Sequence, residues 1–264
     1  MRKKNSNVLI QKARFNKTIF SNNSKTNKIY KVFKSKVFKY VGKKSFALGV
    51  SGGPDSLCLA YFSKLYATEF KNEIYVFIVD HKIRNNSSSE ALKVKQILKK
   101  LNIQSTILTW RGKSPKKNIQ SFAREMRYTL IAKNCIKNHI KYLLTAHHQD
   151  DQIENFLIRL FRGSGLSGLS SMSEEFNFSE NLKIIRPFLS FDKRNLEHIT
   201  KFFFGTYIVD PSNVNENFLR TRIRRYRKTF DKEGFDTKKI IKTVNNLATA
   251  KKALEFYKNV AMKK

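Results

Sequence analysis

The chain has 264 residues, enough for one large α/β domain and a small second one. It contains no run approaching the roughly 20 apolar residues of a membrane span. Its two cysteines, Cys58 and Cys135, are far apart, which argues against a disulfide framework, a structural zinc site and a cysteine-ligated cluster. Lysine and arginine number 53 against 20 acidic residues, and the resulting charge of +33 favours a polyanionic partner.

The N-terminal region is basic throughout, and the first acidic residue of the chain is Asp55. Residues 1–27 are rich in Lys, Asn and Ser and have no clear period, so we predict a flexible basic tail. Organelle transit peptides share this composition but usually carry more arginine. Between Ile29 and Tyr40, apolar residues recur near helical spacing, which predicts a helix that leads into the domain.

The next segment carries the strongest signal. The apolar run Phe46–Val50 predicts a strand at about 45–50, and residues 54–67 are typical of a helix. The stretch between them is Ser51-Gly-Gly-Pro-Asp-Ser56, which we call the phosphate loop. A glycine turn that opens a helix binds anions through free N–H groups, and Pro54 suits a first helical turn. No lysine follows the glycines as in the G-x-x-x-x-G-K-[ST] loop, so the predicted ligand is the pyrophosphate part of ATP.

The remaining elements alternate in the same way. Ser87 and Glu90 have the spacing of a capping box at a helix start. The further strands are expected at 74–79, 105–110 and 142–146, and the further helices at 87–101, 116–138 and 150–162. This alternation predicts a doubly wound α/β fold with a mostly parallel sheet.

Polar clusters follow three of the predicted strands. They are the phosphate loop, the pair Asp80-His81, and the run His147-His-Gln-Asp-Asp151. Ligands of open α/β sheets bind outside the carboxyl ends of the strands. We therefore predict that all three clusters line one crevice.

These motifs, in their order along residues 45–225, resemble the tRNA(Ile)-lysidine synthetases, a family of the N-type ATP pyrophosphatases or PP-loop superfamily. The resemblance rests on the phosphate loop and on six further stretches, namely Val79–Arg84, Ala123–Tyr128, Thr145–Gln152 with Glu154, Arg162–Leu169, Arg186-Pro187 and Asp210–Asn213. It implies an adenine nucleotide alpha hydrolase-like, Rossmann-like fold with a short helical C-terminal extension.

The resemblance also implies a reaction. ATP, with Mg²⁺, would adenylate the C2 oxygen of the wobble cytidine in the CAU anticodon of tRNA(Ile). The ε-amine of free L-lysine would then displace AMP, forming lysidine and changing decoding from AUG to AUA. The expected compartment is intracellular, either a bacterial cytoplasm or an AT-rich organelle such as a plastid stroma or mitochondrial matrix, with no membrane partner.

Roles follow for the residues that match the family motifs. The ATP-binding set is Ser51, Gly52, Gly53, Pro54, Asp55 and Ser56, with Asp80 and His81 near the ribose and base. The catalytic set is Asp55, Arg127, His147 and Asp151, and Asp150 and Asp151 are the candidate Mg²⁺ ligands. The candidate substrate-binding residues are Arg124, Asp150, Glu154, Arg220, Arg222 and Arg224. Ordinary helix caps and solvated charges are the competing interpretation of each set.

The expected organisation is a catalytic domain at 28–216 and a basic, tRNA-contacting segment of one or two short helices at 217–264. The sequence departs from the family at Gln120, where members commonly carry Glu, and at Thr221, where Asn is usual. Two rival functions remain open at this point. One is an ATP-dependent tRNA thiolase, against which the isolated cysteines argue, and the other is a catalytically silent tRNA-binding relative.

Overall fold

The computed structural model describes residues 24–84, 86–112, 119–170, 172–210, 216 and 218–262. The tail expected at 1–27 lies mostly outside the described residues. So do the start of the helix expected at 116–138, the Pro211–Asn213 part of one motif, and the side chain of Gln120.

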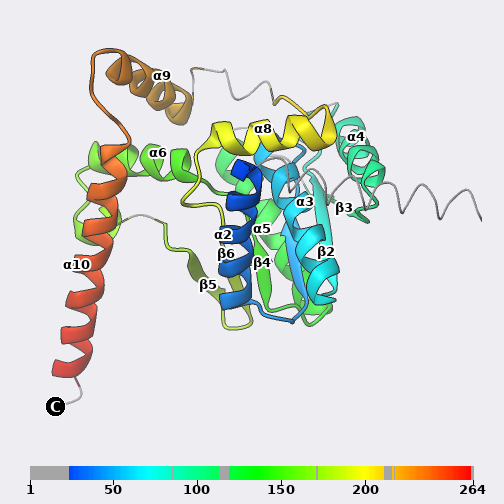
Figure 1. Ribbon diagram of the computed structural model, residues 1–264, viewed down its shortest axis with the longest axis horizontal. Coiled ribbons are helices and arrows are strands. Elements are labelled where there is room, and N and C mark those ends of the chain that lie inside the picture. Colours follow the sequence, from blue (N-terminus) through cyan, green and yellow to red (C-terminus); the bar gives the residue numbers. More distant parts are fainter. Residues whose placement is uncertain are drawn as a thin grey trace, which may run out of the picture.

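A six-stranded sheet with the order β3-β2-β1-β4-β6-β5 forms the centre of the molecule (Figure 1). Its strands are β1 (Phe46–Gly49), β2 (Ile74–Asp80), β3 (Thr106–Thr109), β4 (Tyr142–Leu144), β5 (Glu175–Ser179) and β6 (Leu182–Ile185). All neighbouring strands are parallel except β5, which pairs antiparallel with β6 at one edge. The mostly parallel sheet is confirmed, whereas the β5–β6 hairpin was not predicted.

Helices cover both faces of the sheet, as a doubly wound fold requires. One face packs against α2 (Ser24–Tyr40), α3 (Pro54–Phe70), α4 (Ser87–Lys100) and α8 (Lys193–Phe204). The other packs against α5 (Ile119–Lys137). A separate apolar cluster joins α6 (Gln149–Leu160), α7 (Leu166–Leu169), α9 (Leu219–Lys232) and α10 (Lys239–Ala261) beside the sheet. In Figure 1, α10 runs down past β5 at the edge of the molecule.

Several local expectations need correction. The lead-in helix begins at Ser24, five residues before Ile29. The capping box at Ser87 is wrong, because Asn86 holds the N-cap position without a side-chain bond and Glu90 instead lies 3.7 Å from Arg84. The C-terminal helices are not both short, since α10 has 23 residues. Within the described part of the chain, no helix combines the length and apolarity needed to span a bilayer.

The segment from α8 to residue 208 supports the phosphate loop from behind. The Thr200 hydroxyl donates a hydrogen bond of 2.6 Å to the carbonyl of Pro54. The Ile208 N–H donates a bond of 2.9 Å to the carbonyl of Gly52. Two backbone carbonyls of the loop are thereby satisfied by a segment outside it, which fixes the shape of the loop.

Candidate active site

The phosphate loop has the shape that its glycines allow. Gly52 has φ +85°, and a Cβ atom there would lie 2.4 Å from the Cγ2 of Val94. Ser56 accepts a bond of 3.2 Å from the Ser51 N–H and donates one of 2.9 Å to the Gly53 carbonyl. The loop is thus closed on itself at the start of α3, where the first N–H groups of a helix form an anion site.

A buried histidine joins this loop to the start of α6. The Nε2 atom of His148 lies 3.5 Å from Asp55 Oδ2 and 3.5 Å from Asp151 Oδ2. Its side chain is only 4% exposed. Burial opposes the imidazolium form, but Asp151, Asp55 and Asp150 together raise the pKa of His148 to about 9. The phosphate loop and the His147–Asp151 run therefore meet at this edge, with His148 between them.

Three carboxylates at this edge differ in how far protein partners already engage them. Asp55 Oδ1 is buried and has no hydrogen-bond partner in the described part of the protein. Asp150 is already engaged, because it accepts the Lys193 N–H at 2.9 Å and forms an ion pair with Arg227. Among the described residues, no group of three or more His, Cys, Asp or Glu side chains is placed to hold a metal. Asp150, expected as a Mg²⁺ ligand, thus already has two protein partners, and its role at a metal stays a prediction. Mg²⁺ commonly takes one or two carboxylates plus substrate phosphates, a pattern that Asp55 and Asp151 fit.

His147 faces a different environment from its neighbour. Its Nδ1 atom lies 2.9 Å from the Thr145 hydroxyl, and its Nε2 atom lies 3.5 Å from a guanidinium nitrogen of Arg124. Since a guanidinium can only donate, Nε2 is the acceptor. Burial lowers the pKa of His147 to about 3, and Arg124 adds to this although Asp151 opposes it. His147 is thus a half-buried, neutral imidazole held between Thr145 and Arg124.

Asp151 is the carboxylate at the centre of the cluster. Burial alone would raise its pKa, but protonated His148 holds it below the usual value. Its Oδ2 atom also accepts a bond of 3.1 Å from the His148 N–H. Asp151 is therefore an ionised side chain whose position is fixed by the start of α6.

Asp80 and His81 follow β2 at the same edge. Asp80 accepts bonds from the Lys82 N–H at 3.1 Å and the Ser88 hydroxyl at 2.8 Å, so it shapes the loop between β2 and α4. Burial, with Arg127 nearby, lowers the pKa of His81 to about 4. His81 Nδ1 is buried without a hydrogen-bond partner among the described residues. His81 is thus the member of the pair whose polar atom a nucleotide can satisfy.

The arginines of α9 divide into two groups. Arg224 donates two bonds of 2.6 and 3.0 Å to Glu154, and Arg227 pairs with Asp150. Arg222 donates to the Glu216 carbonyl. Arg220 lies close enough to lower the pKa of both His147 and Asp151. Arg220 therefore lies near His147 and Asp151, whereas Arg224 and Arg227 fasten α9 to α6.

Sequence reasoning missed His148 and Arg227. The feature that could have identified His148 is its position just before Asp150 and Asp151, at a strand end that was predicted to meet the loop carrying Asp55. The signal for Arg227 was spacing, since Arg224 and Arg227 share one helix face and Asp150 and Glu154 share another.

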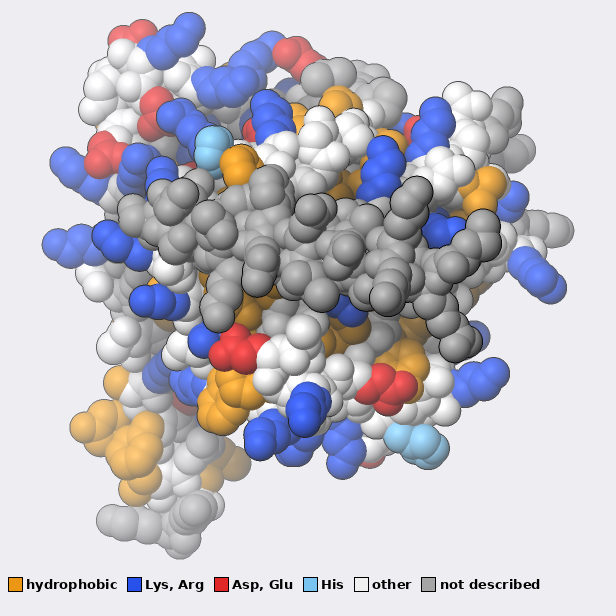
Figure 2. All heavy atoms as spheres, turned by 45° about the vertical axis from the view of Figure 1, so that its right-hand side comes forward, with side chains coloured by type: hydrophobic (Ala, Val, Ile, Leu, Met, Phe, Trp, Pro, Cys, Tyr) orange, Lys and Arg blue, Asp and Glu red, His pale blue; other side chains and the backbone are white. Residues whose placement is uncertain are grey.

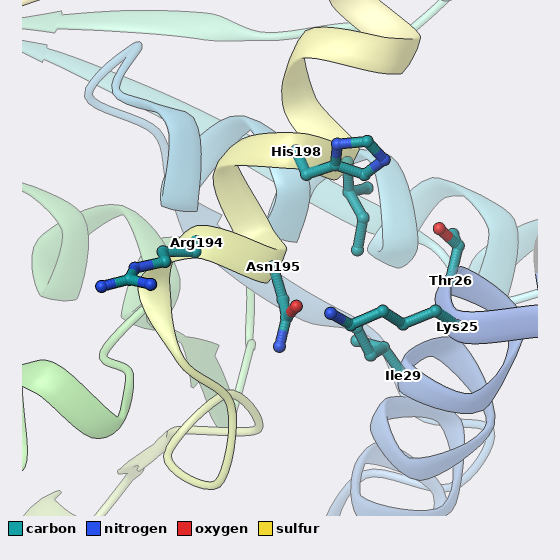
Figure 3. A pocket seen from close by; sticks show the side chains of 7 residues that line it. Lys25, Thr26, Ile29, Arg194, Asn195 and His198 are labelled. Atoms are coloured by element: carbon teal, nitrogen blue, oxygen red, sulfur yellow. The ribbon is translucent and has the colours of Figure 1, made fainter. Parts of the chain in front are cut away.

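A cavity of about 260 Å³ lies apart from this site, between the start of α2 and α8 (Figure 3). None of the predicted site residues lines it. Its lining residues are Lys25, Thr26, Ile29, Arg194, Asn195, His198 and Ile199. The candidate active site lies instead at the carboxyl ends of the parallel strands, where the phosphate loop and the carboxylates meet.

Comparison with known proteins gives a consistent result. Residues 22–227 match the PP-loop domain family. The chain is 42% identical over 178 residues to a tRNA(Ile)-lysidine synthase of Orientia tsutsugamushi (strain Boryong), covering 67% of this chain and 40% of that protein. It is 39% identical over 217 residues to the tRNA(Ile)-lysidine synthase of Wolbachia pipientis wMel, covering 81% and 50%. The chain thus spans about half the length of these relatives, and the resemblance seen in the motifs is confirmed.

Among solved structures, the chain is similar to the U34-tRNA thiolase NcsA of Methanococcus maripaludis, which was solved with its [4Fe-4S] cluster. The TM-score is 0.68 at 18% identity, over 84% of this chain and 80% of that one. This likeness concerns the fold. The two cysteines here, Cys58 and Cys135, are both buried, and burial raises the pKa of each thiol.

Proposed function

Because the chain belongs to the PP-loop domain family, we propose that it uses ATP to ligate lysine to tRNA. The substrate would be the wobble cytidine in the CAU anticodon of tRNA(Ile), and the product lysidine. The adenylated tRNA would be the intermediate, with AMP and pyrophosphate released. The observation that carries the proposal is the 3.5 Å approach of His148 to both Asp55 and Asp151, which joins the ATP loop to the acid–base residues.

The phosphate loop would hold the triphosphate through the N–H groups at the start of α3. Mg²⁺, held by Asp55 and Asp151, would neutralise the charge that develops on the departing pyrophosphate. Asp80 and His81 border the place that the ribose and base would occupy. Arg127, half-buried on α5 near His81, would also face the nucleotide.

Lysine must lose a proton before its ε-amine becomes a nucleophile. Ionised Asp151 would hold the ammonium by charge. Neutral His147, whose Nε2 is an acceptor, would lie within reach of the amine or of the cytidine oxygen. Glu154 is bonded to Arg224, so its proposed role is to position that arginine rather than to bind lysine.

The RNA would approach the edge where Arg124 and Arg220 are free of carboxylate partners among the described residues. Figure 2 shows Lys and Arg side chains around the outline of the visible face, in keeping with the charge of +33. Phosphate contacts of this kind position an RNA without reading its sequence. Residues 28–216 would form the catalytic unit, and the segment 217–264 would contribute RNA contacts beside its attachment to α6. The relatives are bacterial, which supports a bacterial cytoplasm as the compartment.

The decisive experiment is incorporation of labelled lysine into tRNA(Ile) with a CAU anticodon. Incorporation should require ATP and Mg²⁺ and should be absent with a tRNA whose wobble base is not cytidine. RNA binding without incorporation would support the silent-binder alternative instead, and transfer of sulfur in place of lysine would support a thiolase.

A further inference from the structure

Two phenylalanines on the edge strand β5 are exposed. Phe176 is 47% and Phe178 is 39% exposed, although both rings belong to a short strand beside the core. The register of β5 shifts between Asn177 and Ser179, so alternation along the strand does not place Phe178; the stacking of its ring on Tyr128 puts it on the α5 face. Phe176 pairs across the strands with Ile184, which packs against α5. The two rings are thus on the α5 face, at an edge that α5 only partly covers.

Aromatic and arginine side chains pack against Phe176 and Phe178 and enlarge the aromatic surface. The Tyr128 ring of α5 stacks on Phe178 with centroids 5.6 Å apart and an interplanar angle of 25°. The Arg124 guanidinium lies 5.1 Å from the Tyr128 centroid, and the Arg186 guanidinium lies 5.5 Å from that of Phe176. Aromatic faces alternate here with guanidinium groups, an arrangement typical of proteins that bind unpaired bases.

This surface leads directly into the candidate active site. Arg124, at its border, also reaches the Nε2 atom of His147 at 3.5 Å. Phe176 and Arg186 lie at the carboxyl end of β6, the edge that holds the phosphate loop and Asp151. A nucleotide chain whose reacting base sits at His147 would therefore pass over Tyr128, Phe178 and Phe176.

The charged groups around this aromatic surface indicate what kind of partner it binds. The nearby acids are already paired, since Glu175 binds Lys183 at 2.8 Å and Glu174 forms an ion pair of 2.6 Å with Lys36. Arg124 is exposed at the border of the aromatic surface, whereas Arg186 is buried behind Phe176 and donates a bond of 2.9 Å to the Ser173 carbonyl. With Arg124 exposed here and a net charge of +33 on the chain, a polyanion is favoured, and an RNA supplies both phosphates and flat bases.

We propose that Tyr128, Phe176 and Phe178 form a stacking platform for the unpaired nucleotides next to the reacting cytidine. This inference rests on the proposed function and adds to it the means by which the loop of the RNA is held open. The platform would accept bases through their π-faces with little sequence preference. Arg124 would contact the backbone beside the stacked bases, and buried Arg186 would support the Phe176 ring from behind.

The test uses the full chain and an anticodon stem–loop RNA carrying 2-aminopurine in place of the A of CAU. Wild-type protein should quench the fluorophore on binding. The Phe176→Leu and Phe178→Leu variants keep apolar bulk but lose the ring. Each should weaken RNA binding by roughly tenfold and abolish most of the quenching. Phe178→Tyr, which keeps an aromatic ring, should retain both the RNA affinity and the quenching of the wild type.

Phe202→Leu, which removes a 50% exposed ring on α8, is the matched control and should bind as wild type. Circular dichroism and thermal melting verify the fold of every variant. The platform is refuted if the folded leucine double variant binds the stem–loop within twofold of wild type. If the platform variants lose binding while wild type forms no lysidine, the proposed function fails and the stacking surface stands.

Discussion

Arg224 on α9 donates two hydrogen bonds, of 2.6 and 3.0 Å, to the carboxylate of Glu154 on α6. The Glu154 side chain is only 3% exposed, while that of Arg224 is 31% exposed. Arg224→Ala would leave a buried carboxylate without its main partner. We expect the free energy of unfolding to fall by about 1–3 kcal/mol, measured by urea denaturation.

The matched control for that variant is Arg225→Ala. Arg225 pairs with Glu216, and both side chains are more than half exposed. Its loss should change the free energy of unfolding by less than about 0.5–1 kcal/mol. Equal effects of the two substitutions would mean that α9 is not fastened to α6 through Glu154.

Adjacent glycines of the phosphate loop should respond differently to alanine. At Gly52, φ is +85° and a Cβ would lie 2.9 Å from Ile208 Cγ1 as well as close to Val94. At Gly53 the nearest atom would be 3.7 Å away, and φ is −70°. Gly52→Ala should therefore destabilise the protein by about 1–3 kcal/mol and weaken ATP binding, as calorimetry would measure. Gly53→Ala should remain near wild type in stability, and a reversed order would contradict this geometry.

His81 should give the protein a pH-dependent stability in the acid range. Burial, with Arg127 nearby, lowers the pKa of His81 from 6.5 to about 4. Between these values the unfolded chain binds the proton and the folded chain does not, so the free energy of unfolding rises with pH. The contribution is fully present above pH 6.5 and is lost as pH falls towards 4, at a cost of about 2 kcal/mol once solvent screening of this partly exposed side chain is included.

Denaturation series of wild type and His81→Gln across this range measure the difference. The free energy of unfolding of His81→Gln should rise less steeply with pH than that of the wild type. His198→Gln, which removes an exposed histidine, controls for the loss of an imidazole elsewhere. Identical slopes for wild type and His81→Gln would show that His81 titrates alike in both states.

Asp151→Asn removes the charge at the centre of the cluster and keeps its shape. We expect turnover in the lysine-incorporation assay to fall by at least about a hundredfold. Affinity for the RNA should change by less than twofold, because that binding depends mainly on phosphate contacts elsewhere. Asp236→Asn on the exposed surface provides the control. Normal turnover in the Asp151 variant would remove this residue from the chemistry.

Local patterns were sufficient to predict the parallel core and the meeting of the two main motifs. Strands such as Ile74–Asp80 are short apolar runs, and the glycine turn at Ser51–Ser56 can only join a strand to a helix start. The carboxyl-edge rule then brought Asp55 and Asp151 together without any knowledge of side chains.

Other features depend on tertiary packing that no local pattern contains. In β5, the sequence Glu-Phe-Asn-Phe-Ser leaves four of five residues exposed, so it lacks the apolar run that marks the central strands. The pairing of Arg224 with Glu154 joins residues 70 positions apart. The ion pair of Asp150 with Arg227 was not predicted for the same reason, because that arginine comes from a helix far along the chain.

The supports behind the phosphate loop have a consequence for synthesis of the protein. Thr200, which binds the Pro54 carbonyl, lies 146 residues downstream of it, and Ile208 follows on the same segment. During translation the loop therefore leaves the ribosome long before the groups that fix its shape. A nascent chain ending before α8 would carry the complete nucleotide motif and still lack its supports, so the ability to bind ATP would be acquired late in elongation.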